Sequence, residues 1–353
     1  MAIPDKMDAV VLRQFNDYGL EKVDVPEPGL HEVLCKVKSV AICGTDPALI
    51  AGKFSHIWPK EFPFIPGHEW AGEVVALGEK AELFGWKVGD RVGGTSHVGC
   101  GICRMCMTGR YNICDNYGNK LVHRHYGHYT NGAYAEYQVT SIKTIHHLPD
   151  SMSFDEGAML DGASIALHSA KRGKITPGDN VVIFGPGPLG LVVLMCSRML
   201  GAGRIIVVGR GARLQKAVEL GAIGVNMEET EPVEEILKLT NGKGAEVVIE
   251  CAGTPVTITQ SVDVARKNAN IVFTGLPKEK AELPMLKIIL EEMNLYGVRA
   301  NQNTCEEVLP LMINGSIRPQ DLITHTFPLK EFSKAMDTFV NRIDGAMKVV
   351  LHP

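Results

Sequence analysis

The sequence predicts an α/β protein whose middle segment forms a parallel β-sheet and whose first segment is rich in β-structure. The chain has 353 residues, enough for two domains that each bury a core of their own. Between about residues 175 and 296, strand-like apolar runs alternate with longer amphipathic segments, which is typical of βαβ units. Before about residue 150, short β-like runs are separated by glycine- and proline-rich turns, which indicates an irregular β-rich domain.

The expected helices and strands follow from these patterns. Ser153 and Glu156 have the spacing of a capping box, so a helix is expected to start there and to continue to Lys171. The stretch from 297 onward is mixed and ends in a strand over 346–351. Earlier strands are expected at 23–25, 32–40, 70–76 and 134–139. In the middle segment we expect strands at 180–184, 204–208, 245–249 and 270–274, and helices at 189–200, 213–220, 233–239 and 256–265.

Charge and hydropathy exclude several classes of protein. The formal net charge of −4 argues against a nucleic-acid partner, which usually requires a basic excess. The longest apolar run, 181–197, is broken by glycines and prolines, so it predicts a strand, a turn and a helix rather than a membrane span. The first residues lack the apolar core of a signal peptide. We therefore expect a cytoplasmic protein with no nucleic-acid or membrane partner.

A glycine-rich turn predicts a dinucleotide site. It follows a buried strand and opens a helix, so the helix N-terminus offers free N–H groups to a pyrophosphate. The alternative is a tight strand–helix turn without a ligand. The turn fits the pattern G-x-G-x-x-G, with Gly185, Pro186, Gly187, Pro188, Leu189 and Gly190.

The end of the next strand predicts which cofactor binds. NAD sites usually place a carboxylate there to bind the ribose 2′-hydroxyl. This chain has Gly209 instead, followed by Arg210 and Arg213, whose guanidinium groups suit a 2′-phosphate. The sequence therefore favours NADP, unless the two arginines only face solvent at the start of a helix.

Four of the nine cysteines fall within fifteen residues and predict a closed metal site. Their thiolates would complete the tetrahedral shell of Zn²⁺, so this ion would be structural rather than catalytic. An iron–sulfur cluster is the rival occupant. The remaining cysteines apart from Cys43 are expected to be buried apolar residues. The four ligands are Cys100, Cys103, Cys106 and Cys114.

Several motifs together make the sequence similar to the zinc-dependent medium-chain alcohol dehydrogenases, in the branch of the sorbitol (polyol) and threonine dehydrogenases. The resemblance covers nearly the whole chain. Its carriers are Cys43-Gly-Thr45-Asp46, Gly67-His68-Glu69, the four-cysteine loop, the segment 132–137, the glycine turn 185–190, the segment 250–253 and the segment 296–299.

The resemblance implies a second, catalytic zinc. By this resemblance, Cys43 and His68 are zinc ligands, although a single cysteine or histidine of this kind is more often a packing residue. The resemblance also places Asp161 at the family's third ligand position. Glu69 is then a fourth, exchangeable ligand or a partner of the ligands. Thr45 matches the hydroxyl that relays the alcohol proton, while a helix-capping role is the alternative. Zinc in such a site acidifies a bound alcohol, which can then pass hydride to the nicotinamide.

The resemblance also implies the architecture and the substrate class. A Rossmann domain with a parallel sheet, residues 158–296, is inserted into a β-rich, chaperonin-10-like catalytic domain made of residues 1–157 and 297–353. Arg299 matches an arginine near the polyol site, and we also count it with the residues that contact the cofactor. We expect a homodimer or homotetramer that oxidises a secondary alcohol of a polyol or sugar. Simple secondary alcohols and L-threonine are the next candidates.

Two other classes remain as alternatives. The chain could be a cofactor-binding or structural member of the family without turnover, or a zinc-free quinone-type reductase. The presence of Cys43, His68 and Thr45 argues against both, because zinc-free relatives lack these ligands.

Overall fold

The structure, a computed structural model, describes residues 3–353 and divides into two units. The first unit joins the N-terminal segment, up to Asp161, to the C-terminal segment that starts at Pro319. The second unit runs from Gly162 to Arg318. It therefore ends later than residue 296, because helix α10 (Cys305–Ile313) follows the last strand and its start is tied to this unit by the bond from Thr304 Oγ1 to the carbonyl of Ser164.

The second unit contains a six-stranded, fully parallel sheet in the order β12-β11-β10-β13-β14-β15. This order is that of a doubly wound dinucleotide-binding sheet, so the parallel Rossmann sheet expected from the sequence is confirmed. The chain reverses direction across the sheet between β10 and β13, where such folds bind their ligands. The strands are β10 (Asn180–Phe184), β11 (Arg204–Gly209), β12 (Ile223–Asn226), β13 (Ala245–Glu250), β14 (Ala265–Phe273) and β15 (Asn294–Gly297).

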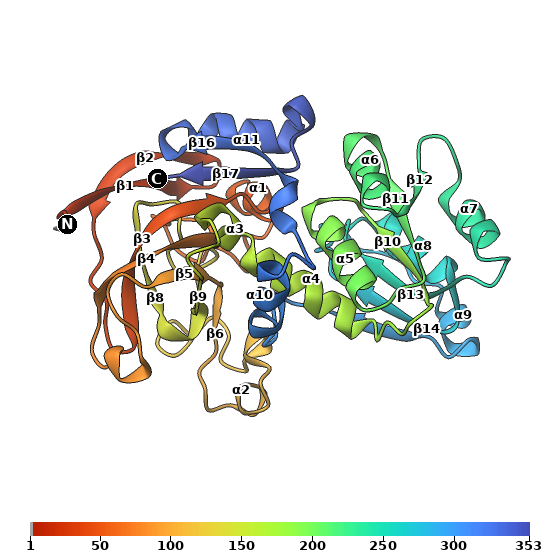
Figure 1. Ribbon diagram of the computed structural model, residues 1–353, viewed down its shortest axis with the longest axis horizontal. Helices are drawn as coiled ribbons and strands as arrows, with labels where there is room; N and C mark the ends of the chain where they lie inside the picture. The colour runs from red at the N-terminus through yellow and green to blue at the C-terminus, as the bar shows by residue number, and fades with distance from the viewer. Residues whose placement is uncertain (1–2) are drawn as a thin grey trace. The chain divides into compact units, whose positions relative to one another are not determined.

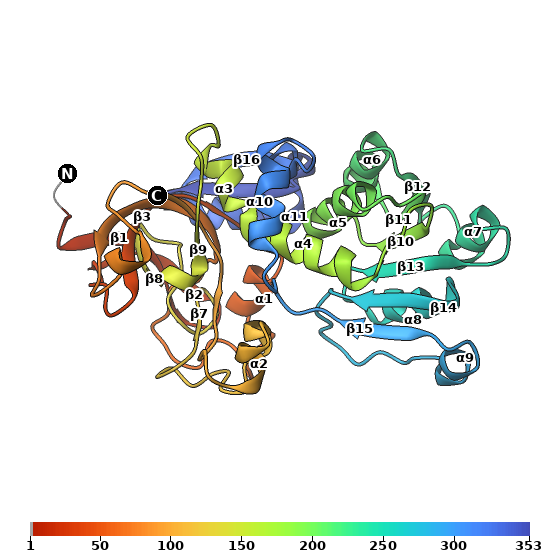
Figure 2. The same cartoon turned by 60° about the horizontal axis from the view of Figure 1, so that its bottom comes forward.

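Helices cover both faces of this sheet (Figures 1 and 2). Right-handed crossovers put the helices of the first half on one face and those of the second half on the other. A cluster of buried apolar side chains lies between one face of this sheet and the helices α7, α8 and α9. The helices are α5 (Pro188–Met199), α6 (Gly211–Glu219), α7 (Pro232–Leu239), α8 (Pro255–Asp263) and α9 (Met285–Leu290).

The first unit is built around a curved, mainly antiparallel sheet in the order β16-β17-β3-β4-β5-β9, with β8 also paired to β3. The C-terminal strand β17 lies beside β3, so both ends of the chain contribute to one sheet. The β-rich catalytic domain predicted from the sequence is confirmed. Its strands are β1 (Lys6–Gln14), β2 (Asp17–Asp24), β3 (Glu32–Ala41), β4 (Glu69–Leu77), β5 (Arg91–Gly94), β6 (His97–Val98), β7 (Arg124–His125), β8 (Tyr137–Ser141), β9 (Ile145–His147), β16 (Ile323–Pro328) and β17 (Lys348–His352).

The helix expected over 153–171 is split in two. Ser153 caps helix α3 (Phe154–Ala158), and the predicted capping box with Glu156 is present. The chain then breaks at Met159, and helix α4 (Leu160–Arg172) continues from there. The first unit also contains α1 (Asp46–Ile50), α2 (Arg104–Met107) and α11 (Phe332–Asn341). Single 3₁₀ turns lie at Glu82–Phe84, Tyr111–Ile113, Ile142–Thr144, Pro319–Leu322, Leu329–Glu331 and Ile343–Gly345.

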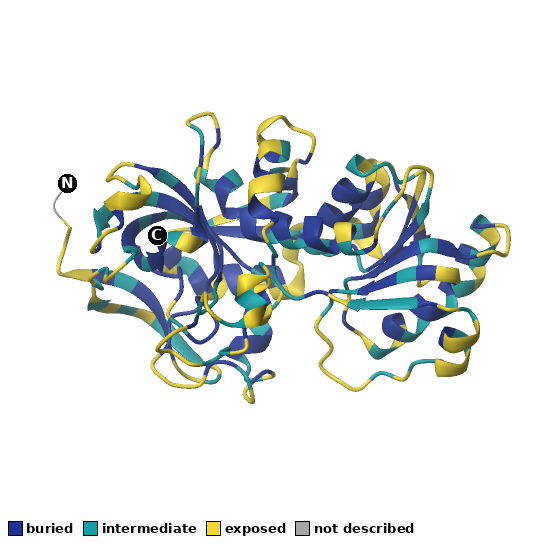
Figure 3. Cartoon of the chain, turned by 90° about the horizontal axis from the view of Figure 1, so that it is seen from below, coloured by how far each residue is buried: buried dark blue, intermediate teal, exposed yellow. Residues whose placement is uncertain are grey.

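Burial follows the strands in both units. Figure 3 shows buried residues along the central strands, with exposed residues at the connecting turns and outer helix faces. Within residues 3–353, no helix combines the length and the apolar character needed to cross a bilayer.

Candidate active site and metal centres

The first candidate site brings together three predicted residues. Cys43 lies just beyond the end of β3, and His68 and Glu69 lie at the start of β4. The two strands are antiparallel, and Ala41 pairs with Glu69, so the end of one strand meets the start of the other. One ligand atom from each of Cys43, His68 and Glu69 lies within 4.8 Å of the other two. The register of β3 and β4 therefore creates a compact set of sulfur, nitrogen and oxygen donors.

A buried carboxylate, Asp46, orients two of these donors. Its Oδ2 accepts hydrogen bonds from the Cys43 backbone N–H at 2.8 Å and from the Tyr134 hydroxyl at 2.6 Å. Its Oδ1 lies 3.5 Å from Nδ1 of His68. A carboxylate facing one imidazole nitrogen directs the other nitrogen towards a metal. The role of Asp46 was missed from the sequence, although its place three residues after Cys43 could have indicated it.

Lys348 is a further residue that the sequence did not reveal. It starts β17, whose Val350 pairs with Ala41, the same residue that pairs with Glu69 from the other side. The ammonium group of Lys348 forms an ion pair with Glu69 Oε2. The side chains of Lys348 and Glu69 are only 5% and 4% exposed. The carboxylate of Glu69 is therefore partly neutralised by the chain's own cation.

The electrostatic field of this site is negative and suits a cation. Burial lowers the pKa of His68, but the charges of Cys43 and Asp46 raise it more, so it lies well above its usual value. The same balance applies to Lys348, whose pKa burial lowers and the charges of Glu69 and Cys43 raise more. The protonated, positively charged forms of His68 and Lys348 are thus favoured although both side chains are buried. Since the site stabilises positive charge, the donor set fits a divalent metal such as zinc.

Asp161 lies outside the group of donors within 4.8 Å, but it is not a solvated helix residue. It is the second residue of α4, and only 1% of it is exposed. The preceding turn packs against the sheet of the first unit, because a Cβ added at Gly93 would lie 3.0 Å from Leu160 Cδ2. The alternative of an exposed Asp161 is wrong, while its role as a ligand stays a prediction.

The hydroxyl group of Thr45 does not cap the helix that it precedes. Thr45 is the N-cap of α1, yet its side chain makes no capping hydrogen bond. Its Oγ1 is buried and has no hydrogen-bond partner among residues 3–353. A buried, unsatisfied hydroxyl is costly and usually has a functional reason. This one is two residues from Cys43 in the chain.

The four-cysteine loop has the dimensions of a tetrahedral zinc site. All four sulfur atoms lie within 4.8 Å of one another. Cys100 and Cys106 are separated by 4.0 Å between sulfurs, and Cys103 and Cys114 by 3.8 Å. In a tetrahedral site, Zn–S bonds of about 2.3 Å place the sulfur atoms about 3.8 Å from one another. Among residues 3–353 all nine cysteines are free of disulfides, so the thiols are available for metal.

Hydrogen bonds to sulfur prepare this loop for thiolates. Backbone N–H groups donate to Cys100 Sγ and Cys103 Sγ at 3.4 Å, and the side-chain amide of Asn116 donates to Cys100 Sγ at 3.2 Å. Donors from Ile102, Asn116 and Cys103 lower the pKa of Cys100 to about 6. Gly99 is required here, because a Cβ would lie 2.5 Å from Cys106 Sγ.

In the second unit, the glycine turn forms an open cradle between β10 and α5. Gly185 has a φ of 96°, which permits the sharp turn, and Gly187 is the N-cap of α5 without a side-chain cap. A Cβ added at Gly187 would meet nothing within 4 Å, whereas one at Gly190 would lie 2.0 Å from the carbonyl oxygen of Gly185. The first N–H groups of α5 thus remain open beside Pro188 and Leu189, which fits a pyrophosphate.

The end of β11 excludes a carboxylate at residue 209. A Cβ added at Gly209 would lie 2.3 Å from the ring of Pro186, so the glycine turn itself requires glycine there. Arg210 is 55% exposed at its side chain and pairs with Glu228, beyond the end of β12, at 2.6 Å. Arg213 lies in the first turn of α6 and is half-buried. Arg210 therefore has a carboxylate partner rather than facing solvent alone.

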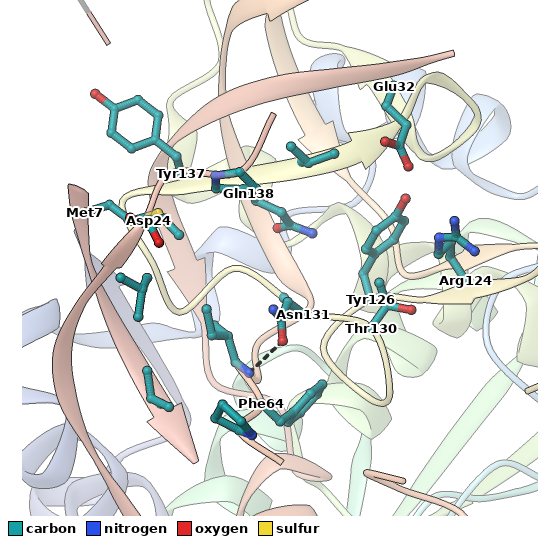
Figure 4. Close-up of a pocket in the computed structure, with 17 residues that line it drawn as sticks. Met7, Asp24, Glu32, Phe64, Arg124, Tyr126, Thr130, Asn131, Tyr137 and Gln138 are labelled. Atoms are coloured by element: carbon teal, nitrogen blue, oxygen red, sulfur yellow. Dashed lines mark hydrogen bonds between the residues drawn. The ribbon is translucent and has the colours of Figure 1, made fainter. Parts of the chain in front are cut away.

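Two further features are a predicted site residue, Arg299, and a cavity. Arg299 follows β15 in the second unit and is half-buried. A cavity of about 280 Å³ in the first unit lies between β1 and the turn before β8 (Figure 4). Its walls include Met7, Phe64, Tyr126, Asn131 and Gln138, and none of the predicted site residues lines it.

Models of known protein families match part of each unit of the chain. Residues 29–150 match the model of the alcohol dehydrogenase GroES-like domain, and residues 188–314 match that of the zinc-binding dehydrogenase domain. The sorbitol dehydrogenase of Bacillus subtilis (strain 168) is 32% identical over 355 residues, covering 99% of this chain and 98% of its own. The L-threonine 3-dehydrogenase of Bacillus licheniformis is 32% identical over 341 residues, covering 94% of each chain.

Solved structures share the whole fold. A zinc-binding dehydrogenase from Sinorhizobium meliloti 1021 bound to NADP superposes with a TM-score of 0.89 at 30% identity, covering 99% of this chain and 100% of its own. The alcohol dehydrogenase rspB from E. coli CFT073, complexed with NADH, gives 0.90 at 28% identity with the same coverage. The chain therefore belongs to the zinc-dependent medium-chain alcohol dehydrogenases, a family of NAD(P)-dependent enzymes.

Proposed function

We propose that this dehydrogenase oxidises a secondary alcohol of a polyol or sugar to the ketone and prefers NADP as the hydride acceptor. The observation that carries the proposal is the donor set of Cys43, His68 and Glu69, two residues from the buried hydroxyl of Thr45, which has no hydrogen-bond partner within residues 3–353. The similarity to the Bacillus subtilis sorbitol dehydrogenase supports a polyol as substrate.

We propose the following roles, of which that of Asp161 rests on the family resemblance alone. Cys43, His68 and Asp161 are the ligands of the catalytic zinc, and Glu69 is a fourth, exchangeable ligand or a charge partner held by Lys348. Bound zinc supplies a Lewis acid, and the nicotinamide accepts hydride. Oγ1 of Thr45 receives the hydrogen bond of the substrate hydroxyl and passes its proton on. Asp46 keeps His68 and the backbone of Cys43 in place.

We assign a second zinc to the four-cysteine loop, which gives two zinc ions per chain. A shell of four thiolates leaves no position for a substrate, so this ion holds the loop together.

The preference for NADP rests on the end of β11. Gly209 has no room for the carboxylate that an NAD site uses, and Arg210 and Arg213 offer guanidinium groups to a 2′-phosphate. We also count Arg299 among the cofactor-contacting residues, as its motif suggests.

A substrate panel tests the proposal. The zinc-loaded enzyme is assayed with polyols, simple secondary alcohols and L-threonine, each with NAD and with NADP. We expect the highest kcat/KM for a polyol with NADP. A higher value for L-threonine would favour the second candidate, which the 32% identical L-threonine 3-dehydrogenase supports, and a higher value for a simple alcohol would reject the polyol proposal.

We further propose a cytoplasmic homodimer or homotetramer. The nine free cysteines favour a reducing compartment. Helix α9 exposes Leu286, Ile289 and Leu290 by 65–72% near the edge strand β15, an apolar surface suited to a second copy. Light scattering of the purified protein measures the oligomeric state, and a monomer at micromolar concentration would contradict the proposal.

A further inference from the structure

The cavity beside the hairpin of β1 and β2 is lined by two polar side chains that lack hydrogen-bond partners in the described part of the chain. The cavity has a volume of about 280 Å³ and belongs to the first unit. Gln138, on β8, is only 3% exposed, yet neither its amide oxygen nor its amide nitrogen has a partner within residues 3–353. The same holds for the buried Oγ1 of Thr130. Buried polar groups are normally satisfied, so these atoms indicate a site for a polar ligand group.

Other polar groups in the cavity wall already have partners. The Tyr126 hydroxyl and the Asn131 side-chain oxygen each accept a hydrogen bond from a backbone N–H at 3.0 Å. Figure 4 shows the amide of Gln138 between Asn131 and Tyr126, pointing towards the middle of the lining residues. A ligand in the cavity would therefore meet one amide that offers a donor and an acceptor side by side.

Most of the remaining wall is apolar. The small separate core under the hairpin supplies part of this surface. Small-molecule sites are typically apolar cavities of about 300–1,000 Å³ with a few convergent polar groups, so this cavity suits a small ligand. The lining residues Asp24 and Pro63 are exposed, so the cavity extends to the protein surface. The apolar side chains include Met7, Val11, Val23, Phe64, Ile65 and Val139.

The charges around the cavity favour an uncharged ligand. Two carboxylates, those of Asp24 and Glu32, line it together with the guanidinium group of Arg124. Arg124 is already engaged, because it donates to the backbone carbonyl oxygen of His123 at 3.2 Å. An anion would have to leave water and face two carboxylates, which is unfavourable.

We propose that this cavity binds a small uncharged molecule that carries a lactam or primary carboxamide group on an apolar body. In such a group an N–H and the carbonyl oxygen lie on the same side, so they can form two hydrogen bonds with the amide of Gln138. The hydroxyl of Thr130 can donate to the second lone pair of the carbonyl oxygen. The site shares no residue with the donor set of Cys43, His68 and Glu69, so it is additional to the proposed oxidation of an alcohol.

The test measures binding of ε-caprolactam to the zinc-loaded enzyme by isothermal titration calorimetry. N-methylcaprolactam is the matched probe, because it keeps the ring and the carbonyl group but lacks the N–H. We expect caprolactam to bind with a Kd of about 1 mM or lower, and N-methylcaprolactam to bind at least about tenfold more weakly. Hexanoate, an anion with a similar apolar body, should bind more weakly than caprolactam as well.

Variants of the cavity wall separate ligand binding from a structural role. Gln138→Met keeps the length of the side chain but removes both polar atoms, so the Kd for caprolactam should rise at least about tenfold. The melting temperature of this variant without ligand should be unchanged or higher, because a buried amide without a partner is removed. A purely structural role of Gln138 would lower it instead. Val23→Phe should fill part of the cavity from β2 and prevent binding.

Gln320→Met is the matched control. The Oε1 atom of Gln320 is also buried and has no hydrogen-bond partner within residues 3–353, but this residue does not line the cavity. The Kd for caprolactam should therefore be the same as in the wild-type enzyme.

The outcomes are distinct from those that test the proposed function. If caprolactam does not bind at about 10 mM, the proposal is overturned, and ordered water is the partner of Gln138. If wild-type enzyme and Gln138→Met bind caprolactam equally well, the lactam binds elsewhere and the assignment of this cavity is refuted. Because the measurement records binding rather than turnover, neither result changes the conclusion about polyol oxidation.

Discussion

Replacing Lys348 by Met should strongly destabilise the first unit. Lys348 and Glu69 form an ion pair whose two side chains are 5% and 4% exposed. Methionine keeps much of the volume of the lysine stem but removes the ammonium group, so the carboxylate of Glu69 stays buried without its cation. Breaking one partner of a buried pair costs about 3–5 kcal/mol, because the remaining charge is neither solvated nor paired.

The size of the effect can be converted into a denaturation midpoint. With an m-value of about 2 kcal/mol/M, the urea midpoint should fall by about 1.5–2.5 M. The pKa of Lys348 is raised above its usual value of 10.5, so the stabilisation is fully present below that pH and is lost as the pH rises through the folded-state pKa. A measurement at pH 7–8 therefore records the whole contribution.

Tryptophan fluorescence is a specific assay for this unit, and it is recorded after mild chelation has removed the exchangeable zinc, so that no metal ion pairs with Glu69 in place of Lys348. The three tryptophans of the chain, Trp58, Trp70 and Trp86, all belong to the first unit. Lys120→Met is a suitable control, because Lys120 pairs with Glu61 on the same unit but both side chains are exposed. That change should cost less than about 1 kcal/mol.

A double variant decides whether the charge is the cause. Glu69→Gln/Lys348→Met removes both charges and should recover at least half of the stability that Lys348→Met loses. A loss below 1 kcal/mol in the single variant, or a double variant as unstable as the sum of the two single variants, would refute the argument.

Three other predictions concern the metals and the cofactor. Mild chelation should remove one zinc per chain and abolish activity before the fold is lost, because the four-thiolate site is closed; metal analysis that finds a single zinc in fully active enzyme would contradict this. Cys43→Ala should abolish turnover while cofactor binding, followed by fluorescence titration, is unchanged, whereas Cys103→Ala should mainly lower the melting temperature. Arg210→Ala should weaken NADP binding by about tenfold to a hundredfold. Glu228→Gln should strengthen NADP binding, because it removes the carboxylate that pairs with Arg210, and Glu229→Gln is the neutral control. Equal Kd values for NADP in all of these variants would show that Arg210 does not contact the 2′-phosphate.

Features encoded by neighbouring residues were predicted best. The strand at 180–184 has the predicted bounds, because a β-branched run ends at a glycine turn with its own signature. The capping box at Ser153 was also correct, since its two partners are three residues apart. The break at Met159 was not predicted, because the sequence between α3 and α4 contains no proline and the interruption depends on packing against the sheet. Strand β12 and helix α9 were missed because they are short and largely exposed.

The parts of the site that sequence reasoning missed depend on tertiary pairing. Cys43 and His68 could be assigned from motifs, but nothing near Lys348 indicates that it binds Glu69. Its place follows only from the register of β17 on β3 and of β3 on β4. His128 likewise lies beside His68, with the two tilted rings 4.5 Å apart, although one residue belongs to a turn and the other precedes a distant strand. Such contacts have no signature in local sequence, because they are set by which strands become neighbours.

The distance in sequence between Glu69 and Lys348 also sets an order of events during synthesis. The two residues are 279 positions apart. At a translation rate of about 5–20 residues per second, the lysine is added about 14–56 s after the glutamate. During this interval the nucleotide-binding unit between them can complete its parallel sheet. The carboxylate of Glu69 cannot yet pair with Lys348, because the lysine has not been synthesised. The first unit to begin synthesis is thus the last to close, because its strand β17 lies at the C-terminal end of the chain and pairs with β3.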